Sequence, residues 1–184
     1  MRAGSEKLMI SKSLQLAFEI ITKEVSDAKK GLGKEVFHFV SSLTPIINVD
    51  LLIKNTCNET LLTWRADEFY GPGWHLPGGV VRFKEDPSSR ILKVASNELG
   101  CSVKHGEAPL TVRSQIATDR DVRGHFISLL YKCSLETPPL PTREALSATP
   151  MNGQWMWHKK APTNLVSVHE SFIVYMNGGN DEPY

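Results

Sequence analysis

The chain of 184 residues has few cysteines, no excess charge of either sign and no long hydrophobic run. Its 3 cysteines are widely spaced, without a Cys-x-x-Cys pair, which disfavours a disulfide framework and a cysteine zinc site. A formal net charge of +1 gives no electrostatic reason to expect nucleic acid or an anionic membrane as partner. No window resembles a transmembrane helix or a secretory signal. We therefore expect a cytoplasmic protein that binds neither nucleic acid nor membrane.

Hydrophobic residues at 41% and charged residues at 22% are ordinary for one globular domain, which at this length buries roughly 70% of its unfolded surface. At the N-terminus, apolar residues recur at steps of four and three: Leu14, Phe18, Ile21, Val25 and Ala28. This stripe predicts an amphipathic helix that ends near Gly31 and Gly33. Its mixed polar face favours packing on its own domain or on a second subunit over membrane contact. We therefore divide the chain into a helical extension, 1–33, and a main domain, 34–184.

The main domain alternates expected strands and helices. A short helix, "KEVFHFVSSL", precedes two apolar runs, "IINVDLLI" and "TLLTW", which we interpret as a hairpin. Further strands are expected at "WHLP", "VVRF", on both sides of the charged segment "ATDRDVRG", and at "GQWMWH", with a last helix in "NLVSVHESFIVYM". We assign four charged residues of this region to a solvated loop: Arg113, Arg120, Asp121 and Arg123. The order predicts an α/β fold with a mixed sheet covered by helices.

The best-defined element is a helix from Pro87 to Leu99. Asp86 is placed to cap its N-terminus, and Gly100 follows its last apolar residue. A glycine pair, Gly78 and Gly79, precedes it. Positions 94, 97 and 98 share one helix face, but only Glu98 of these is an acid. A metal site here would have a single carboxylate on its helix.

This region resembles the signature of the Nudix hydrolases: Gly, five residues, Glu, seven residues, Arg-Glu, an apolar residue, any residue, Glu-Glu, any residue, Gly. The positions of this chain that align with the signature residues are Gly79, Glu85, Lys93, Val94, Asn97, Glu98 and Gly100. The resemblance implies a Nudix-type α/β/α sandwich and Mg²⁺ as cofactor. Lys93 replaces the usual arginine, and Val94 and Asn97 replace usual acids. We expect Glu85 to orient the loop through Lys93 instead of contacting substrate.

The flanking sequence is similar to the GDP-mannose mannosyl hydrolase branch of that family, which also has fewer acids. "TPIINVDLLI" and "LLTWRADEFYGPGWHLPGG" resemble its first strands. The resemblance implies that Asp50 and Arg65 are catalytic and that the Gly78 carbonyl and Glu98 bind Mg²⁺. It further implies a homodimer that cleaves the sugar C–O bond of GDP-mannose or a related GDP-hexose. One metal suffices for that reaction in principle, because it neutralises a leaving diphosphate.

The chain departs from this branch where a glutamine and a catalytic histidine would precede "QWMWH". Met151 and Asn152 stand there, and neither suits the role, since methionine is a poor ligand for a hard cation and asparagine does not titrate. His158 and His125 are the candidates for a replacement base. The branch's active-site tyrosine is Phe126 here.

Three functions stay open from the sequence. The first is the nucleotide-sugar hydrolase with C–O cleavage, and the second is a Nudix pyrophosphohydrolase that cuts a P–O bond. The third is a catalytically weak domain that binds a nucleotide sugar or a protein. Single residues also have ordinary structural interpretations: Glu98 and Arg65 as surface residues, and Asp50 as a buried acid with a structural partner.

Overall fold

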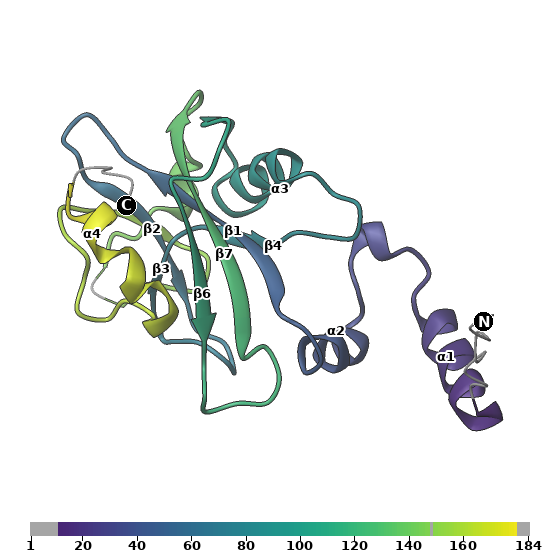
Figure 1. Cartoon of the computed structure of the whole chain (residues 1–184). Helices are drawn as coiled ribbons and strands as arrows, with labels where there is room; N and C mark the ends of the chain where they lie inside the picture. Colours follow the sequence, from purple (N-terminus) through teal and green to yellow (C-terminus); the bar gives the residue numbers. More distant parts are fainter. Residues whose placement is uncertain (1–10, 148, 180–184) are drawn as a thin grey trace, which may run out of the picture.

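The computed structural model describes residues 11–147 and 149–179 (Figure 1). Its larger sheet has the order β4 (Gly78–Val80), β1 (Ile46–Ile53), β7 (His125–Leu135) and β5 (Val103–His105), and β6 (Thr111–Ile116) also pairs with β7. A smaller sheet has the order β3 (Gly73–His75), β2 (Thr60–Arg65) and β8 (Trp155–His158). β1 and β7 are parallel and the other pairings are antiparallel. The predicted mixed sheet is confirmed.

Alternate residues of β1 enter two different hydrophobic clusters. Val49, Leu51 and Ile53 belong to the cluster that contains Ile91 of α3 (Pro87–Val94). Leu52 belongs to the second cluster, together with Phe172 of η4 (Ser167–Phe172), the 3₁₀ helix that leads into α4 (Ile173–Met176). Because side chains of a strand alternate between faces, Asp50 shares the face of Leu52 and lies on the side of the C-terminal helices.

The predicted hairpin of "IINVDLLI" and "TLLTW" is wrong. These segments are β1 and β2, which belong to different sheets and meet in the isolated bridge between Lys54 and Thr60. Each strand has only two edges, and those of β1 are occupied by β4 and β7. β2 therefore leaves the larger sheet and pairs with β3 and β8, which carries Arg65 to a position near Gly78.

The helix after the glycine pair forms as predicted at both ends. The Asp86 carboxylate accepts a hydrogen bond from the Ser88 N–H at 2.8 Å, and Pro87 is the first helical residue. Gly100 ends it in the left-handed region at φ 65°. The last turn, η2 (Ala95–Leu99), is a π-helix, which the sequence did not predict. Such turns are frequent at functional sites, and Glu98 lies in this one.

The N-terminal helix α1 (Lys12–Glu24) is shorter than predicted and is followed by the 3₁₀ turn η1 (Ala28–Lys30) and by α2 (Lys34–Ser41). α1 has no buried residue and projects away from the body of the protein (Figure 1). Residues 1–10 of the predicted extension lie outside the described residues, and the domain boundary at 33 remains a prediction. In the described ranges 11–147 and 149–179, no helix is long and apolar enough to cross a membrane.

Two shorter elements also differ from expectation. Of "VVRF" only Val80 belongs to a strand. The expected C-terminal helix is the 3₁₀ helix η4 followed by the short α4, not one continuous helix. The 3₁₀ turn matters for the site, because it buries His169 against Asp50 of β1.

Candidate functional site

Two adjoining cavities share Arg65, His75 and Gly78 in their walls. The larger has a volume of about 690 Å³ and includes Glu98. The smaller has a volume of about 130 Å³ and includes Asp50. The four residues that the resemblance assigned to catalysis and metal binding, Asp50, Arg65, Gly78 and Glu98, therefore line one continuous region of the surface.

The glycine pair permits the close approach of three elements. A Cβ atom on Gly78 would lie 2.5 Å from the Asp50 carboxylate, and one on Gly79 would lie 2.9 Å from Val94 of α3. Both distances are shorter than a carbon atom tolerates. Val94 is 4% exposed, so the position where the Nudix signature has an acid is here part of the core between α3 and β4.

Glu98 lines the larger cavity. It is therefore not an ordinary surface residue, which was the alternative interpretation from the sequence. Burial raises its pKa to about 8, although Arg65, the Gly78 N–H and the Thr63 hydroxyl favour its charged form. Neighbouring Asn97 is exposed, and its backbone carbonyl accepts a hydrogen bond from Arg143 at 2.7 Å. Glu98 is thus a desolvated carboxylate that gains from any cation bound beside it.

Asp50 is 1% exposed and accepts two hydrogen bonds. Asn48 donates to its Oδ1 at 3.0 Å, and the Ser128 hydroxyl donates to its Oδ2. His169 Nε2 lies 3.2 Å from Oδ1, while His169 Nδ1 accepts the Leu76 N–H at 3.0 Å. Since Nδ1 accepts, Nε2 is the ring nitrogen that carries a proton, and it is the nitrogen nearer to Asp50. Asp50 is therefore a buried carboxylate with two hydrogen-bond donors, on the wall of the smaller cavity.

His75 lines both the cavity of Asp50 and the cavity of Glu98. It was not predicted from sequence as a site residue. The Thr63 hydroxyl lies 3.2 Å from its Nε2, and its ring stacks on His169 with centroids 6.1 Å apart. Burial and the neighbouring His169 lower the pKa of His75 to about 3. His75 is therefore a neutral imidazole that lines both cavities.

Glu85 lies behind the site and is held by three residues. Its carboxylate accepts from Lys93 at 2.8 Å, from Arg90 Nε at 2.8 Å and from the Arg82 N–H at 3.0 Å. Burial raises its pKa, but these hydrogen bonds outweigh burial and lower the value to about 2. Lys93 contacts Glu85 as expected. Arg90, 6% exposed, is a further partner that the sequence analysis did not identify.

Arg113, predicted to lie in a solvated loop, is in strand β6 instead. The same prediction is also wrong for Arg120 and Arg123. Their guanidinium groups lie 4.6 Å and 5.8 Å from the centroid of Tyr70, and Arg65 lies 4.8 Å from the same ring. Arg123 also stacks on Phe69 at 4.7 Å. Aromatic faces attract these cations, which draws the loop toward the smaller cavity. Tyr70 and Arg123 are in its wall.

The structure does not bring the two candidate bases into the site. His125, at the start of β7, shares a hydrogen bond of 2.9 Å with the Ser114 hydroxyl. His158 packs on Trp74, with ring centroids 4.5 Å apart. Neither lines the two site cavities. Asn152 does line the larger one, where its Oδ1 accepts the Ala66 N–H at 3.1 Å. The position expected to hold a histidine is thus at the site but carries an amide.

The donor set fits a single hard cation with few protein ligands. The described residues contain no cluster of three or more acidic, histidine or cysteine side chains suited to a metal. Glu98 supplies one carboxylate, and Gln154 adds an amide oxygen to the same wall, although that oxygen accepts the Met151 N–H at 2.7 Å. Mg²⁺ commonly keeps several waters and takes further ligands from phosphates, so one carboxylate suits it.

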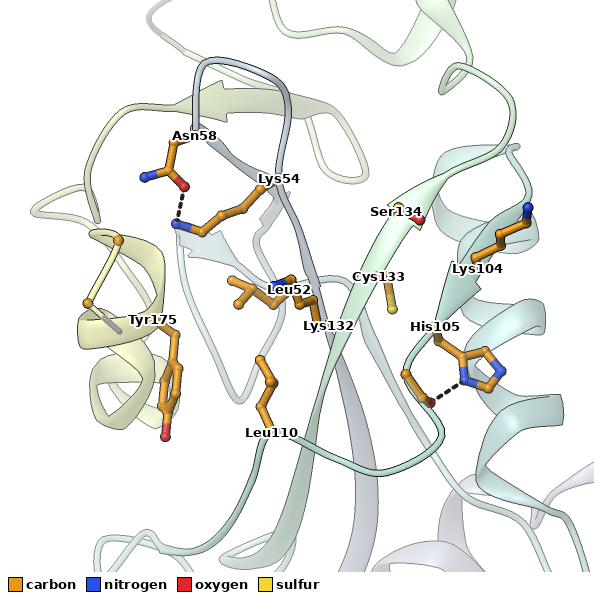
Figure 2. A pocket seen from close by; sticks show the side chains of 13 residues that line it. Leu52, Lys54, Asn58, Lys104, His105, Leu110, Lys132, Cys133, Ser134 and Tyr175 are labelled. Atoms are coloured by element: carbon orange, nitrogen blue, oxygen red, sulfur yellow. Dashed lines mark hydrogen bonds between the residues drawn. The ribbon is translucent and has the colours of Figure 1, made fainter. Parts of the chain in front are cut away.

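A third cavity of about 480 Å³ lies away from these residues, between β7, β5 and the C-terminal helix (Figure 2). Lys54 there donates to Asn58 at 3.0 Å and to the Met176 carbonyl at 3.2 Å. His105 contacts the Gly106 carbonyl at 2.8 Å. None of the residues predicted for catalysis or metal binding lines this cavity.

Comparison with solved structures identifies the fold. A MutT protein from Methanosarcina mazei aligns with 76% of this chain and 99% of its own, at TM-score 0.55 and 19% identity. A UDP-X diphosphatase aligns over 90% of both chains at TM-score 0.54 and 17% identity. A Nudix-family hydrolase from Clostridium perfringens covers 74% of this chain and 97% of its own, at TM-score 0.52 and 13% identity. The chain has the Nudix hydrolase fold.

Sequence comparison is less informative. No family model matches the chain. The low-salt glycan biosynthesis protein Agl8 of Haloferax volcanii is 28% identical over 50% of this chain. The match spans 60% of that relative's length.

Proposed function

We propose that this protein is a Mg²⁺-dependent hydrolase of a nucleotide-linked sugar, with GDP-mannose or a related GDP-hexose as the first candidate. One observation carries the proposal: Glu98, Arg65 and Asp50 line adjoining cavities around Gly78. Of the two acids in the larger cavity, Asp67 is paired with Arg65, which leaves Glu98 as the acid for a metal. The similarity to a glycan biosynthesis protein agrees with a sugar-linked substrate.

In this proposal the larger cavity holds the nucleoside diphosphate and the smaller one holds the sugar. Bound Mg²⁺, held by Glu98 and the Gly78 carbonyl, would neutralise charge on the diphosphate. Arg65 binds the same phosphates through its guanidinium group. Asp50, held by hydrogen bonds from Asn48 and Ser128, stabilises positive charge that develops on the sugar ring. Water attacks the anomeric carbon, the C–O bond breaks, and the nucleoside diphosphate leaves.

Cleavage of a P–O bond is the second candidate, and the similarity to a UDP-X diphosphatase over 90% of both chains favours it. Hydrolysis in ¹⁸O-labelled water with Mg²⁺ separates the two. Label in the free sugar supports C–O cleavage, and label in a phosphate product supports P–O cleavage. Binding of nucleotide sugars without any turnover would favour the third candidate, a binding domain.

We also propose that the protein is a homodimer with α1 at the interface. Leu14 and Phe18 of the apolar stripe are 46% and 52% exposed, and no residue of α1 is buried. A helix of 13 residues is marginal in water without tertiary packing. An apolar cavity of about 610 Å³ near the start of the domain, lined by Phe37, Val40 and Ile47 among others, is a surface that a helix from a second copy can cover.

A further inference from the structure

His75 lies at the junction of the two site cavities. Their walls have three residues in common, Arg65, His75 and Gly78. In the proposed function the larger cavity holds the nucleoside diphosphate and the smaller one holds the sugar, so the bond that joins them lies at this junction. Gly78 has no side chain, and Arg65 is paired with Asp67. The imidazole of His75 is therefore the polar side chain of the junction that still lacks a role.

Strand β3 directs the His75 ring away from the core. Neighbouring Trp74 belongs to the second hydrophobic cluster, and because side chains alternate along a strand, His75 lies on the other face of β3. There it is opposite Thr63 of β2, and its ring stacks on His169 of η4 at an interplanar angle of 23°. These two contacts restrict the rotation of the imidazole.

The hydrogen bonds around this ring make one of its nitrogens an acceptor. The Thr63 hydroxyl lies 3.2 Å from His75 Nε2 and 3.4 Å from Nδ1, and it donates its single proton to the Glu98 carboxylate. Its oxygen can therefore only accept from His75, and the shorter distance assigns the ring proton to Nε2. Nδ1 is then a lone-pair acceptor, and no other group in the described ranges 11–147 and 149–179 donates to it.

The surroundings of His75 keep that lone pair free of a proton. Burial has the largest effect and lowers the pKa, His169 and Arg65 lower it further, and the Thr63 backbone and Asp50 raise it, with a resulting pKa of about 3. The ring is thus neutral at neutral pH. A neutral imidazole has one acceptor nitrogen, whereas an imidazolium ion has none.

The other histidines do not offer such an acceptor. All 6 histidines lie in the part of the chain that the structure describes, and only His75 and His169 among them line a site cavity. His169 Nδ1 already accepts the Leu76 N–H, and its Nε2 lies beside Asp50. His75 Nδ1 is therefore the imidazole acceptor that a ligand can use.

The part of the substrate that meets this acceptor is a hydroxyl of the sugar. Ionised phosphate oxygens accept hydrogen bonds and do not donate them, so the diphosphate cannot bind Nδ1. The anomeric carbon lies at the junction, and the hydroxyl nearest to it is the one on C2 of the sugar. Hydrogen bonds to this hydroxyl become stronger in the transition state of glycosidic cleavage.

We propose that His75 selects sugars with a free hydroxyl on C2, which donates a hydrogen bond to the His75 imidazole. This inference rests on the proposed hydrolase of nucleotide sugars and narrows its substrate to nucleoside-diphosphate sugars that carry this group, as mannose does. A 2-deoxy sugar lacks the donor. A 2-acetamido sugar places a bulky group in a cavity of about 130 Å³.

The test compares GDP-mannose with its 2-deoxy analogue in the wild type and in His75→Phe, with Mg²⁺. The measured quantity is the ratio of the two kcat/KM values, because comparing this ratio between the two proteins cancels the different intrinsic reactivity of the sugars. His75→Phe keeps an aromatic ring beside His169 but removes the acceptor. It should lower kcat/KM for GDP-mannose by about 10–100-fold and leave that for the analogue within about 3-fold.

Two further variants separate this role from a structural one. His75→Gln has an amide oxygen that can accept the same hydrogen bond, so it should keep a ratio at least about 3-fold above that of His75→Phe. His158→Phe is the matched control, because His158 lies in the same small sheet and packs on an aromatic ring but lines neither cavity. It should leave the ratio unchanged.

The outcomes distinguish this inference from the proposed function. If His75→Phe lowers kcat/KM equally for both substrates, or changes neither, selection by His75 is overturned while the hydrolase stands. If the wild type hydrolyses neither compound, the proposed function fails, and calorimetric binding of the same two compounds decides on His75. Tighter binding of GDP-mannose that His75→Phe abolishes supports the inference, and equal binding overturns it.

Discussion

His169 links the Leu76 backbone to the Asp50 carboxylate. Its Nδ1 accepts the Leu76 N–H at 3.0 Å, and its Nε2 lies 3.2 Å from Asp50 Oδ1. His169 is 6% exposed and belongs to the C-terminal 3₁₀ helix, whereas Asp50 is in the middle of β1. The 3₁₀ helix η4 thus positions the acid that the proposed reaction needs.

Replacing His169 by alanine should weaken both the fold and the site. Asp50 loses its contact with His169 Nε2 and the Leu76 N–H loses its acceptor, so the free energy of unfolding should fall by about 1–3 kcal/mol. Hydrolysis should fall by about 10-fold or more in kcat, because Asp50 is no longer held in place. Denaturant unfolding and steady-state kinetics measure these effects. His105→Ala, at a histidine that lines neither site cavity, is the control, and equal losses in both variants would refute a specific role.

Glu98→Gln should abolish Mg²⁺-dependent hydrolysis without loss of stability. The folded state raises the pKa of Glu98 from 4.5 to about 8, so the wild type loses stability as pH rises between these values. Without Mg²⁺, the neutral variant should therefore be more stable at pH 8.5 by about 1–2 kcal/mol. Thermal unfolding with and without Mg²⁺ measures this.

In that experiment Mg²⁺ should stabilise the wild type and the exposed control Glu107→Gln but not Glu98→Gln. Near wild-type activity of Glu98→Gln would place the metal elsewhere.

Glu85→Gln should cost stability in a pH-dependent way. The folded state lowers the pKa of Glu85 from 4.5 to about 2, so its contribution is complete above pH 4.5 and is lost as pH falls toward 2. We expect a loss of about 1–3 kcal/mol at pH 7 that shrinks steadily below pH 4.5. Urea unfolding at several pH values checks it. Glu136→Gln, at an exposed ion pair with Lys104, should change stability by less than about 1 kcal/mol at every pH.

Removal of residues 1–30 should convert the proposed dimer to a monomer, because the apolar stripe of α1 is removed. Phe18→Ser should weaken the dimer in the full chain, while Lys23→Ser, on the opposite face of the same helix, should not. Light scattering over a range of protein concentrations measures the mass. A full chain that is monomeric at all concentrations, or a truncated chain that stays dimeric, contradicts an interface at α1.

Turnover of GDP-mannose should be slow, with no ascending limb near pH 6.5 in its pH profile, because Asn152 stands where a histidine would act as base. A general base typically contributes about 10²–10⁴-fold, so Asn152→His should accelerate hydrolysis. His125→Ala and His158→Ala should leave the rate unchanged, since neither residue lines the site. A fast wild type whose ascending limb survives both alanine variants would show that the alignment around Asn152 is wrong.

Much of the fold was determined by local sequence patterns. The apolar run of β1, the Asp86 and Gly100 caps of the helix, and the glycine pair before it depend on interactions within a few residues, which the local sequence reveals. The same spacing put Gly79, Glu85 and Glu98 in one frame, and the structure brings Gly78, the neighbour of Gly79, and Glu98 to the same cavity wall.

Only the tertiary structure decided which distant side chains complete the site. His169 carries no local signal, because its partners Leu76 and Asp50 lie far away in the sequence. Arg123 appeared as one charge in a polar loop, yet packing on Phe69 and Tyr70 turns it inward. The sequence predicted that β1 and β2 form a hairpin, but β4 and β7 occupy both edges of β1. Sequence spacing therefore predicts elements and their ends, whereas strand pairing, burial and charge compensation depend on contacts that form only when the whole chain is folded.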